Sequence, residues 1–104
     1  MAWIVLVVSG VLEAIWAAAL DESEGFSKLG PSVMFLVALA LSMAGLAYAM
    51  RSIPLGTAYA VWVGIGAVLT VAYAMASGAE PVSPARVVLL AGIVGCVVGL
   101  KLIE

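Results

Sequence analysis

Residues 7–20 read VVSGVLEAIWAAAL, an apolar run interrupted by a single acid, Glu13. The run begins at Trp3 and ends at Leu20, which is close to the ~20 residues that cross a bilayer as an α-helix. We therefore expect a transmembrane helix that carries a carboxyl group near its middle.

The rest of the chain repeats this apolar pattern. Of its 104 residues, 66% are hydrophobic and 10% are charged, whereas about a quarter of the residues of a soluble domain are charged. Proline, which fits the first helical turn, precedes or begins each later run. We expect one all-α integral membrane domain over residues 1–104, with very short loops and four spans at about 3–20, 31–50, 54–76 and 84–102.

The charges exclude several classes of function. The net charge is -2, the chain has no His, and no cluster of basic residues is present, so we expect no binding to nucleic acid. Cys96, the single cysteine, lies inside the fourth run and is interpreted as a packing residue. No loop is large enough to form a domain outside the membrane. We expect no cofactor, no metal site and no enzymatic activity, and we expect lipid, a small solute and further copies of the chain as partners.

The basic residues give no preferred orientation in the membrane. Arg51 and Lys101 fall on one expected side, and Lys28 and Arg86 on the other, although orientation usually follows an excess of Lys and Arg on one side. A chain without this bias can insert both ways.

The fourth span carries a stripe of small residues, Gly92, Gly95 and Gly99. Such a stripe lets two helix backbones approach closely in lipid. We expect the stripe to pack two copies into an antiparallel, dual-topology dimer. The alternative is that these glycines pack against helices of the same chain.

Glu13 is the strongest candidate for a functional residue. At about 1.5 Å per residue it lies ~2 Å from the middle of its span, where an ionised carboxylate costs at least ~2.5 kcal/mol on insertion scales. Intramembrane acids often mark ion or proton pathways, and the alternative is a permanently protonated acid that serves only helix packing. One carboxyl group holds a proton or a cation in competition, which suffices for an exchanger.

The neighbours of Glu13 on a helix suit a cation. Gly10 and Ala17 are small and leave room beside the acid, and Trp16 offers an aromatic face and an N–H donor. The third span repeats this chemistry in a stripe of Tyr59, Trp62, Val63 and Gly66, and the second span adds Ser42 in mid-membrane. These aromatic residues can also serve packing alone.

The segments GVLEAIWAAAL, EGFSKLGPS, PLGTAYAVWVGIGAV and GLKLIE resemble the small multidrug resistance transporters along essentially the whole chain. The resemblance implies a proton-coupled antiporter of the bacterial inner membrane that works as an antiparallel dimer. It makes Glu13 the group that binds both proton and substrate. The residues it implies as lining or orienting that site are Gly10, Trp16, Ser42, Tyr59 and Trp62.

Trp16 and the WVGIG segment look like the guanidinium-exporter branch of that family, so we expect export of guanidinium or small guanidinyl cations. One alternative within this class is an exporter of hydrophobic quaternary ammonium cations. Others are one subunit of a heterodimeric transporter and a membrane assembly subunit that transports nothing. Two positions depart from the family pattern: Asp21 stands where most members have Lys, and Val63 where the exporter branch commonly has Thr.

Overall fold

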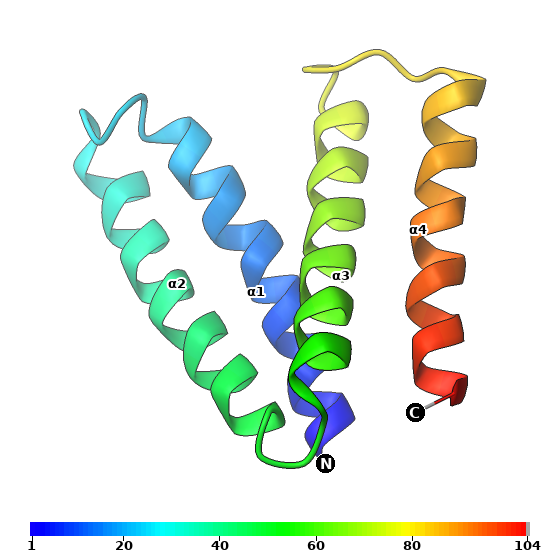
Figure 1. Ribbon diagram of the computed structural model, residues 1–104. Coiled ribbons are helices and arrows are strands. Elements are labelled where there is room, and N and C mark those ends of the chain that lie inside the picture. Colours follow the sequence, from blue (N-terminus) through cyan, green and yellow to red (C-terminus); the bar gives the residue numbers. More distant parts are fainter. Residues whose placement is uncertain (104) are drawn as a thin grey trace.

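The computed structural model describes residues 1–103 and consists of four α-helices joined by short connections (Figure 1). All four are long and apolar enough to cross a membrane. This confirms the all-α fold with four spans. Glu104, the last residue of the expected domain, lies outside the described residues. The helices are α1 (Ala2–Glu22), α2 (Leu29–Ala49), α3 (Leu55–Ala76) and α4 (Pro84–Ile103).

The helices alternate in direction, so the connections fall at two opposite ends (Figure 1). The N-terminus, the α2–α3 connection and the end of α4 share one end, which we call the N-terminal end. The α1–α2 and α3–α4 connections share the other, which we call the acidic end because Asp21, Glu22, Glu24 and Glu80 lie there. In Figure 1 the α1–α2 pair and the α3–α4 pair lean apart towards the acidic end.

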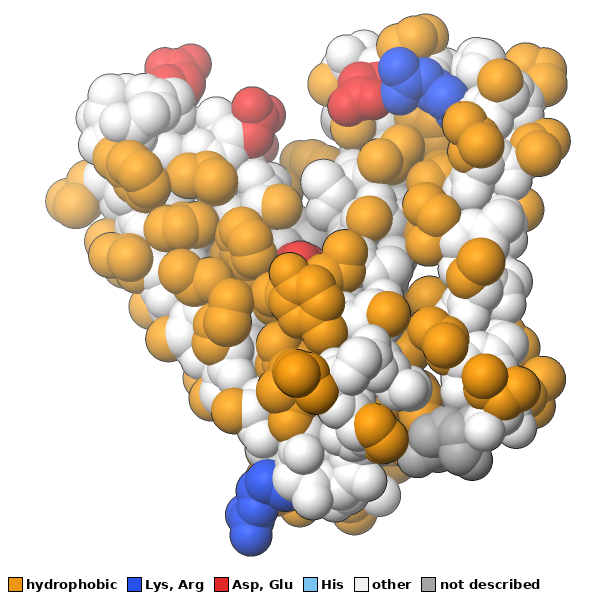
Figure 2. All heavy atoms as spheres, in the orientation of Figure 1, with side chains coloured by type: hydrophobic (Ala, Val, Ile, Leu, Met, Phe, Trp, Pro, Cys, Tyr) orange, Lys and Arg blue, Asp and Glu red, His pale blue; other side chains and the backbone are white. Residues whose placement is uncertain are grey.

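Helix α1 is the centre of the packing, because it contacts both α2 and α3, whereas the backbone of α4 packs against α3. The buried core lies towards the N-terminal end and consists of Leu6, Leu46, Ala49, Ile53, Ala58, Val61 and Trp62. Within the described chain, α4 buries none of its residues. Large hydrophobic side chains are exposed on all four helices and cover much of the face shown in Figure 2, as expected for a protein whose backbone polar groups are paired within helices and whose solvent is lipid.

Glycines allow the helices to approach closely. A Cβ atom added at Gly10 of α1 would lie 2.8 Å from Ile65 of α3, and one added at Gly64 of α3 would lie 2.7 Å from Val97 of α4. Both distances are shorter than an ordinary van der Waals contact, so these close contacts depend on the absence of a side chain.

The prolines lie at the helix starts. Pro31 lies in the first turn of α2 and Pro84 is the first residue of α4, whereas Pro54 immediately precedes α3. With φ of −55° and ψ of 146°, Pro54 has an extended backbone. It therefore caps the helix from outside its first turn.

Ser23 fixes the connection after α1. It is fully buried, and its hydroxyl donates to the carbonyl of Leu20 at 2.7 Å and accepts from the N–H of Phe26 at 3.1 Å. Glu24, Gly25 and Phe26 all have positive φ, a conformation that is uncommon outside glycine. This tight turn ends α1 directly after Asp21 and Glu22 and so holds both acids at the acidic end.

Candidate functional site

Glu13 lies where α1 meets α3. Its carboxyl group packs so closely against Gly66 that a Cβ atom added there would collide with its Cγ, Cδ and Oε1 atoms. The Oε1 atom is buried and has no hydrogen-bond partner within residues 1–103. A buried acceptor without a donor costs free energy, so this position favours a proton or a cation as the partner of the carboxyl group.

Trp16 presents a second polar atom of the same kind one turn along α1. Its indole N–H is buried and has no acceptor in the described chain. The ring makes an edge contact with Phe35 of α2 at 5.9 Å between centroids, and Phe35 makes another with Phe26 at 5.4 Å. The α2 side therefore holds the indole ring while its N–H group stays available as a donor.

A chain of hydrogen bonds connects three helices beside Glu13. The indole N–H of Trp62 donates to the Ser42 hydroxyl at 3.0 Å, and that hydroxyl donates to the backbone carbonyl of Ser9 at 2.7 Å. Ser9 stands one turn before Glu13 on α1. The chain therefore fixes α2 and α3 relative to the turn of α1 that carries the acid.

The predicted site residues other than Gly10 lie in two neighbouring groups. Glu13 and Trp16 share α1, whereas Ser42 and Trp62 are buried in the hydrogen-bonded chain. Tyr59 packs on Trp62 with ring centroids 5.8 Å apart and remains 53% exposed. Within residues 1–103, the second group donates no hydrogen bond to the buried Oε1 atom of Glu13.

Gly10 and Gly66 both lie where α1 contacts α3. The space beside Gly10 is filled by Ile65, so within one chain this glycine brings α3 against α1. Gly66 belongs to the stripe with Tyr59 and Trp62, but sequence reasoning gave it no separate role. Its spacing of four residues after Trp62 was the available signal, because it places both residues on one face of α3. Nothing in the sequence pattern indicated that Phe35 would contact Trp16.

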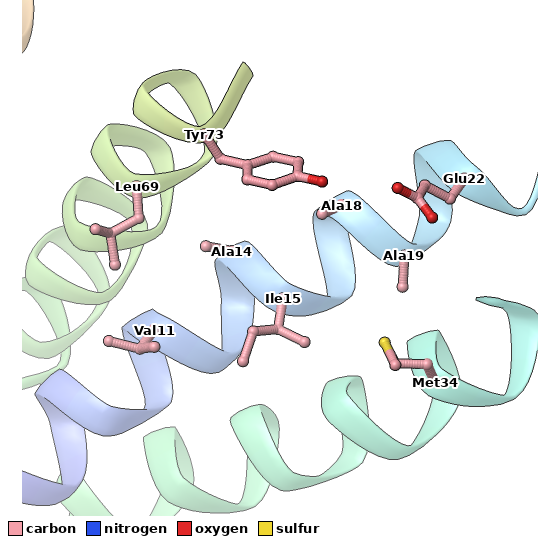
Figure 3. Close-up of a pocket in the computed structure, with 9 residues that line it drawn as sticks. All are labelled: Val11, Ala14, Ile15, Ala18, Ala19, Glu22, Met34, Leu69 and Tyr73. Atoms are coloured by element: carbon pink, nitrogen blue, oxygen red, sulfur yellow. The ribbon is translucent and has the colours of Figure 1, made fainter. Parts of the chain in front are cut away.

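Two adjoining cavities lie along α1 and α3 on the side of the acidic end. One, of about 390 Å³, is shown in Figure 3, where Tyr73 reaches from α3 towards Ala18 of α1 and Glu22 lies farther along α1. The other, of about 520 Å³, shares these three residues. Its full lining is Ala17, Ala18, Asp21, Glu22, Thr70, Tyr73, Ala74, Ser77, Ala79 and Glu80.

The larger cavity has an inner and an outer part. Ala17 and Thr70 stand one turn after Glu13 and Gly66, whereas Asp21, Glu22 and Glu80 contribute carboxylates at the acidic end. Figure 2 shows acidic side chains at this end on both the α1–α2 pair and the α3–α4 pair, and another in the hollow between the pairs at mid-height. Of the three outer carboxylates, that of Glu80 forms an ion pair with Arg86. The outer part of this cavity is therefore lined by negative charge.

The glycine stripe of α4 faces open space within residues 1–103. Cβ atoms added at Gly92, Gly95 and Gly99 would meet no atom within 4 Å, beyond their immediate neighbours and the helix backbone, in the part of the chain that is described. Gly92 and Gly95 are exposed.

Four helices that can span a membrane, and a carboxyl group with a buried, unpartnered oxygen between two of them, are features of a small multi-pass membrane transporter. The family model described as Small Multidrug Resistance protein matches residues 1–93, and the chain belongs to this family. This confirms the resemblance stated from the sequence. The protein is therefore a transporter of the bacterial cell membrane and not an enzyme.

The chain is similar to several bacterial proteins named guanidinium exporter. The protein of Yersinia pseudotuberculosis serotype I (strain IP32953) is 54% identical, and the match covers 98% of each chain. The protein of Escherichia coli (strain K12) is 50% identical, and that of Salmonella typhimurium (strain LT2) is 46% identical. In both cases the match covers 98% of this chain and 97% of the relative.

Proposed function

We propose that the protein is a proton-coupled antiporter that exports guanidinium or small guanidinyl cations. The observation that carries the proposal is the buried Oε1 atom of Glu13, which has no partner within residues 1–103. The similarity to guanidinium exporters at about half identity over nearly the whole chain supports this choice of substrate.

The chemistry follows from what one carboxyl group can hold. A proton neutralises Glu13 and a guanidinium ion pairs with its carboxylate, so one displaces the other. Guanidinium is planar and carries N–H donors in a fork that matches both carboxylate oxygens. If guanidinium binds from one side of the membrane and a proton replaces it on the other, the fluxes of guanidinium and protons are coupled.

The surrounding residues suit a small, flat cation. In our proposal Trp16 and Trp62 supply aromatic faces that attract cations, and Ser42 holds Trp62 in place through their hydrogen bond. Tyr59 and Gly10 line or orient the same site.

We further propose that the transporter is an antiparallel homodimer. The α4 stripe of Gly92, Gly95 and Gly99 is free of contacts within the described chain and allows close helix packing. Tyr59, half exposed beside Trp62, is available to a second copy. The even distribution of basic residues over the two ends suits a chain that inserts both ways. A heterodimer with a related chain is the alternative arrangement.

The decisive experiment is electrogenic transport in proteoliposomes. Guanidinium applied under a proton gradient is expected to drive current in the wild type and none in Glu13→Gln. If the two proteins behave alike, proton-coupled exchange at Glu13 is wrong. A chain that only assembles other subunits would give no cation-driven current at all.

The same assay separates the two substrate classes. Quaternary ammonium cations have no N–H donors and cannot form the forked pair with the carboxylate. We therefore expect larger currents with guanidinium than with a tetraalkylammonium ion at equal concentration. The reverse order would support the multidrug alternative.

A further inference from the structure

We propose that Gly66 is a positioning residue for Glu13: the absence of a side chain at this position of α3 determines where the carboxyl group lies and whether it can form a forked pair with guanidinium. The inference rests on the proposed function for its ligand, but the contact between the two residues is independent of it.

The first support is steric. Gly66 is buried, and an added Cβ atom would overlap three successive atoms of Glu13, from Cγ to Oε1. The carboxyl group therefore occupies the volume that a side chain at residue 66 would take. No other described glycine has an acidic side chain among the nearest neighbours of its added Cβ.

The second support is that no hydrogen bond competes with this packing at the buried oxygen of the carboxyl group. Its Oε1 atom has no hydrogen-bond donor within residues 1–103. On the α3 side, the carbonyl of Gly66 accepts a hydrogen bond of 2.6 Å from the Thr70 hydroxyl and, as in any α-helix, the N–H four residues on. Packing against residue 66 rather than a hydrogen bond thus sets the position of the Oε1 atom.

The third support is that α3 has little freedom to retreat. Ile65 of α3 fits against Gly10 of α1, and Gly64 fits against Val97 of α4. Trp62 donates a hydrogen bond to Ser42, and Ser42 donates one to the Ser9 carbonyl, one turn before Glu13 on α1. A methyl group at residue 66 is therefore expected to displace the Glu13 side chain rather than the helix.

Displacement of the Glu13 carboxyl group is expected to affect its binding of a proton and of guanidinium unequally. A proton needs only one oxygen and little space, whereas a forked pair needs both oxygens in one plane at a fixed place. A misplacement of about 1 Å can cost 10²-fold in a positioned site. We expect Gly66→Ala to weaken guanidinium binding by on the order of 10²-fold and to leave proton exchange at residue 13 measurable.

The experiment is a double-mutant cycle with an internal rescue. Glu13→Asp draws the carboxyl group back by one methylene and away from residue 66. Guanidinium affinity is measured for Gly66→Ala, Glu13→Asp and the double variant, by quenching of tryptophan fluorescence in detergent. The double variant is expected to bind no more weakly than Glu13→Asp alone. Gly64→Ala, the same substitution at the α3–α4 contact, is the matched control and should add its effect to that of Glu13→Asp.

Each outcome decides the proposal. If the losses from Gly66→Ala and Glu13→Asp simply add, Gly66 does not act through the carboxyl group and the proposal is wrong. If Gly66→Ala does not fold, recovery of folding in the double variant supports the steric contact, and failure of the double variant while Glu13→Asp folds overturns it. Proton release from residue 13 on acid–base titration reports the same coupling without guanidinium. A wild type that binds no guanidinium would therefore refute the proposed substrate but not the positioning of Glu13 by Gly66.

Discussion

The indole N–H of Trp62 donates a hydrogen bond of 3.0 Å to the hydroxyl of Ser42, across the interface between α3 and α2. Ser42 in turn donates its own hydrogen to the Ser9 carbonyl on α1. One hydroxyl group therefore connects all three helices around the candidate site, in surroundings where an unpaired polar group is costly.

Replacing Ser42 with alanine is expected to destabilise the fold. The substitution leaves the buried Trp62 N–H without its acceptor, so we expect the free energy of unfolding to fall by about 1 kcal/mol. Unfolding in detergent micelles measures it. Ser32→Ala is the control, because Ser32 bonds only a carbonyl of its own N-terminal turn at an exposed position. Equal losses in the two variants would contradict a role for Ser42 between helices.

Trp16 is expected to determine selectivity through its N–H group. Trp16→Phe keeps an aromatic ring and removes the donor, so guanidinium affinity should fall about fivefold, the equivalent of one hydrogen bond. Trp16→Ala should move selectivity towards bulkier quaternary ammonium cations, because it also opens space. Competition binding of the two cation types measures both effects. Unchanged selectivity in Trp16→Ala would show that Trp16 serves packing with Phe35 alone.

The sequence predicted the number of helices, because the lengths of the apolar runs determine it. The depth of Glu13 in the membrane stays a prediction. The predicted first span ended at Leu20, whereas α1 continues through Asp21 to Glu22. Hydropathy marks where side chains leave the apolar phase, but backbone hydrogen bonds extend the helix beyond that point until the Ser23 turn.

The contacts of the site could not be predicted in the same way. That Glu13 meets Gly66, and that Ser42 bonds the Ser9 backbone, depends on how α1 is rotated and shifted against α2 and α3. Helical periodicity gives the residues that share a face of one helix, but it does not give the register between two helices. Glycines and aromatic residues that share a helix face could therefore be recognised as candidates, but the residues that they contact on other helices could not.

The carboxylates at the acidic end are expected to raise the local concentration of cations. Asp21→Asn and Glu22→Gln should raise the KM for guanidinium several-fold at low ionic strength, with less change in kcat, because negatively lined clefts attract cations. Added salt should reduce the difference, since interactions between exposed charges are largely screened beyond about 10 Å at 0.1 M salt. Glu24→Gln is the control: Glu24 is exposed, pairs with Lys28 and does not line the cavity. An equal effect of all three variants would exclude a specific role of the cavity.

Bulk at the centre of the α4 stripe is expected to weaken the dimer. Gly95→Leu places a large side chain where close helix packing needs none, so the monomer fraction should rise in single-molecule photobleaching or crosslinking in liposomes. Gly56→Leu is the matched control, because an added Cβ there also meets nothing within 4 Å and the residue lies on α3. If both variants dimerise like the wild type, α4 does not form the interface.

Guanidinium binding is expected to depend on pH. A proton and guanidinium compete for the Glu13 carboxyl, so acid must weaken guanidinium binding and alkali must strengthen it until the proton is lost. Where residue 13 is mostly protonated, each unit fall in pH should raise the apparent Kd up to about tenfold, the slope for displacement of one proton. Above that range the Kd should become constant. Binding isotherms at several pH values measure the slope. Asp21→Asn should keep it, because that carboxylate acts only at the acidic end, whereas Glu13→Gln should abolish measurable guanidinium binding at every pH. A wild-type Kd that does not change with pH would mean that proton and cation occupy different groups, and the exchange mechanism would then need a second carboxylate.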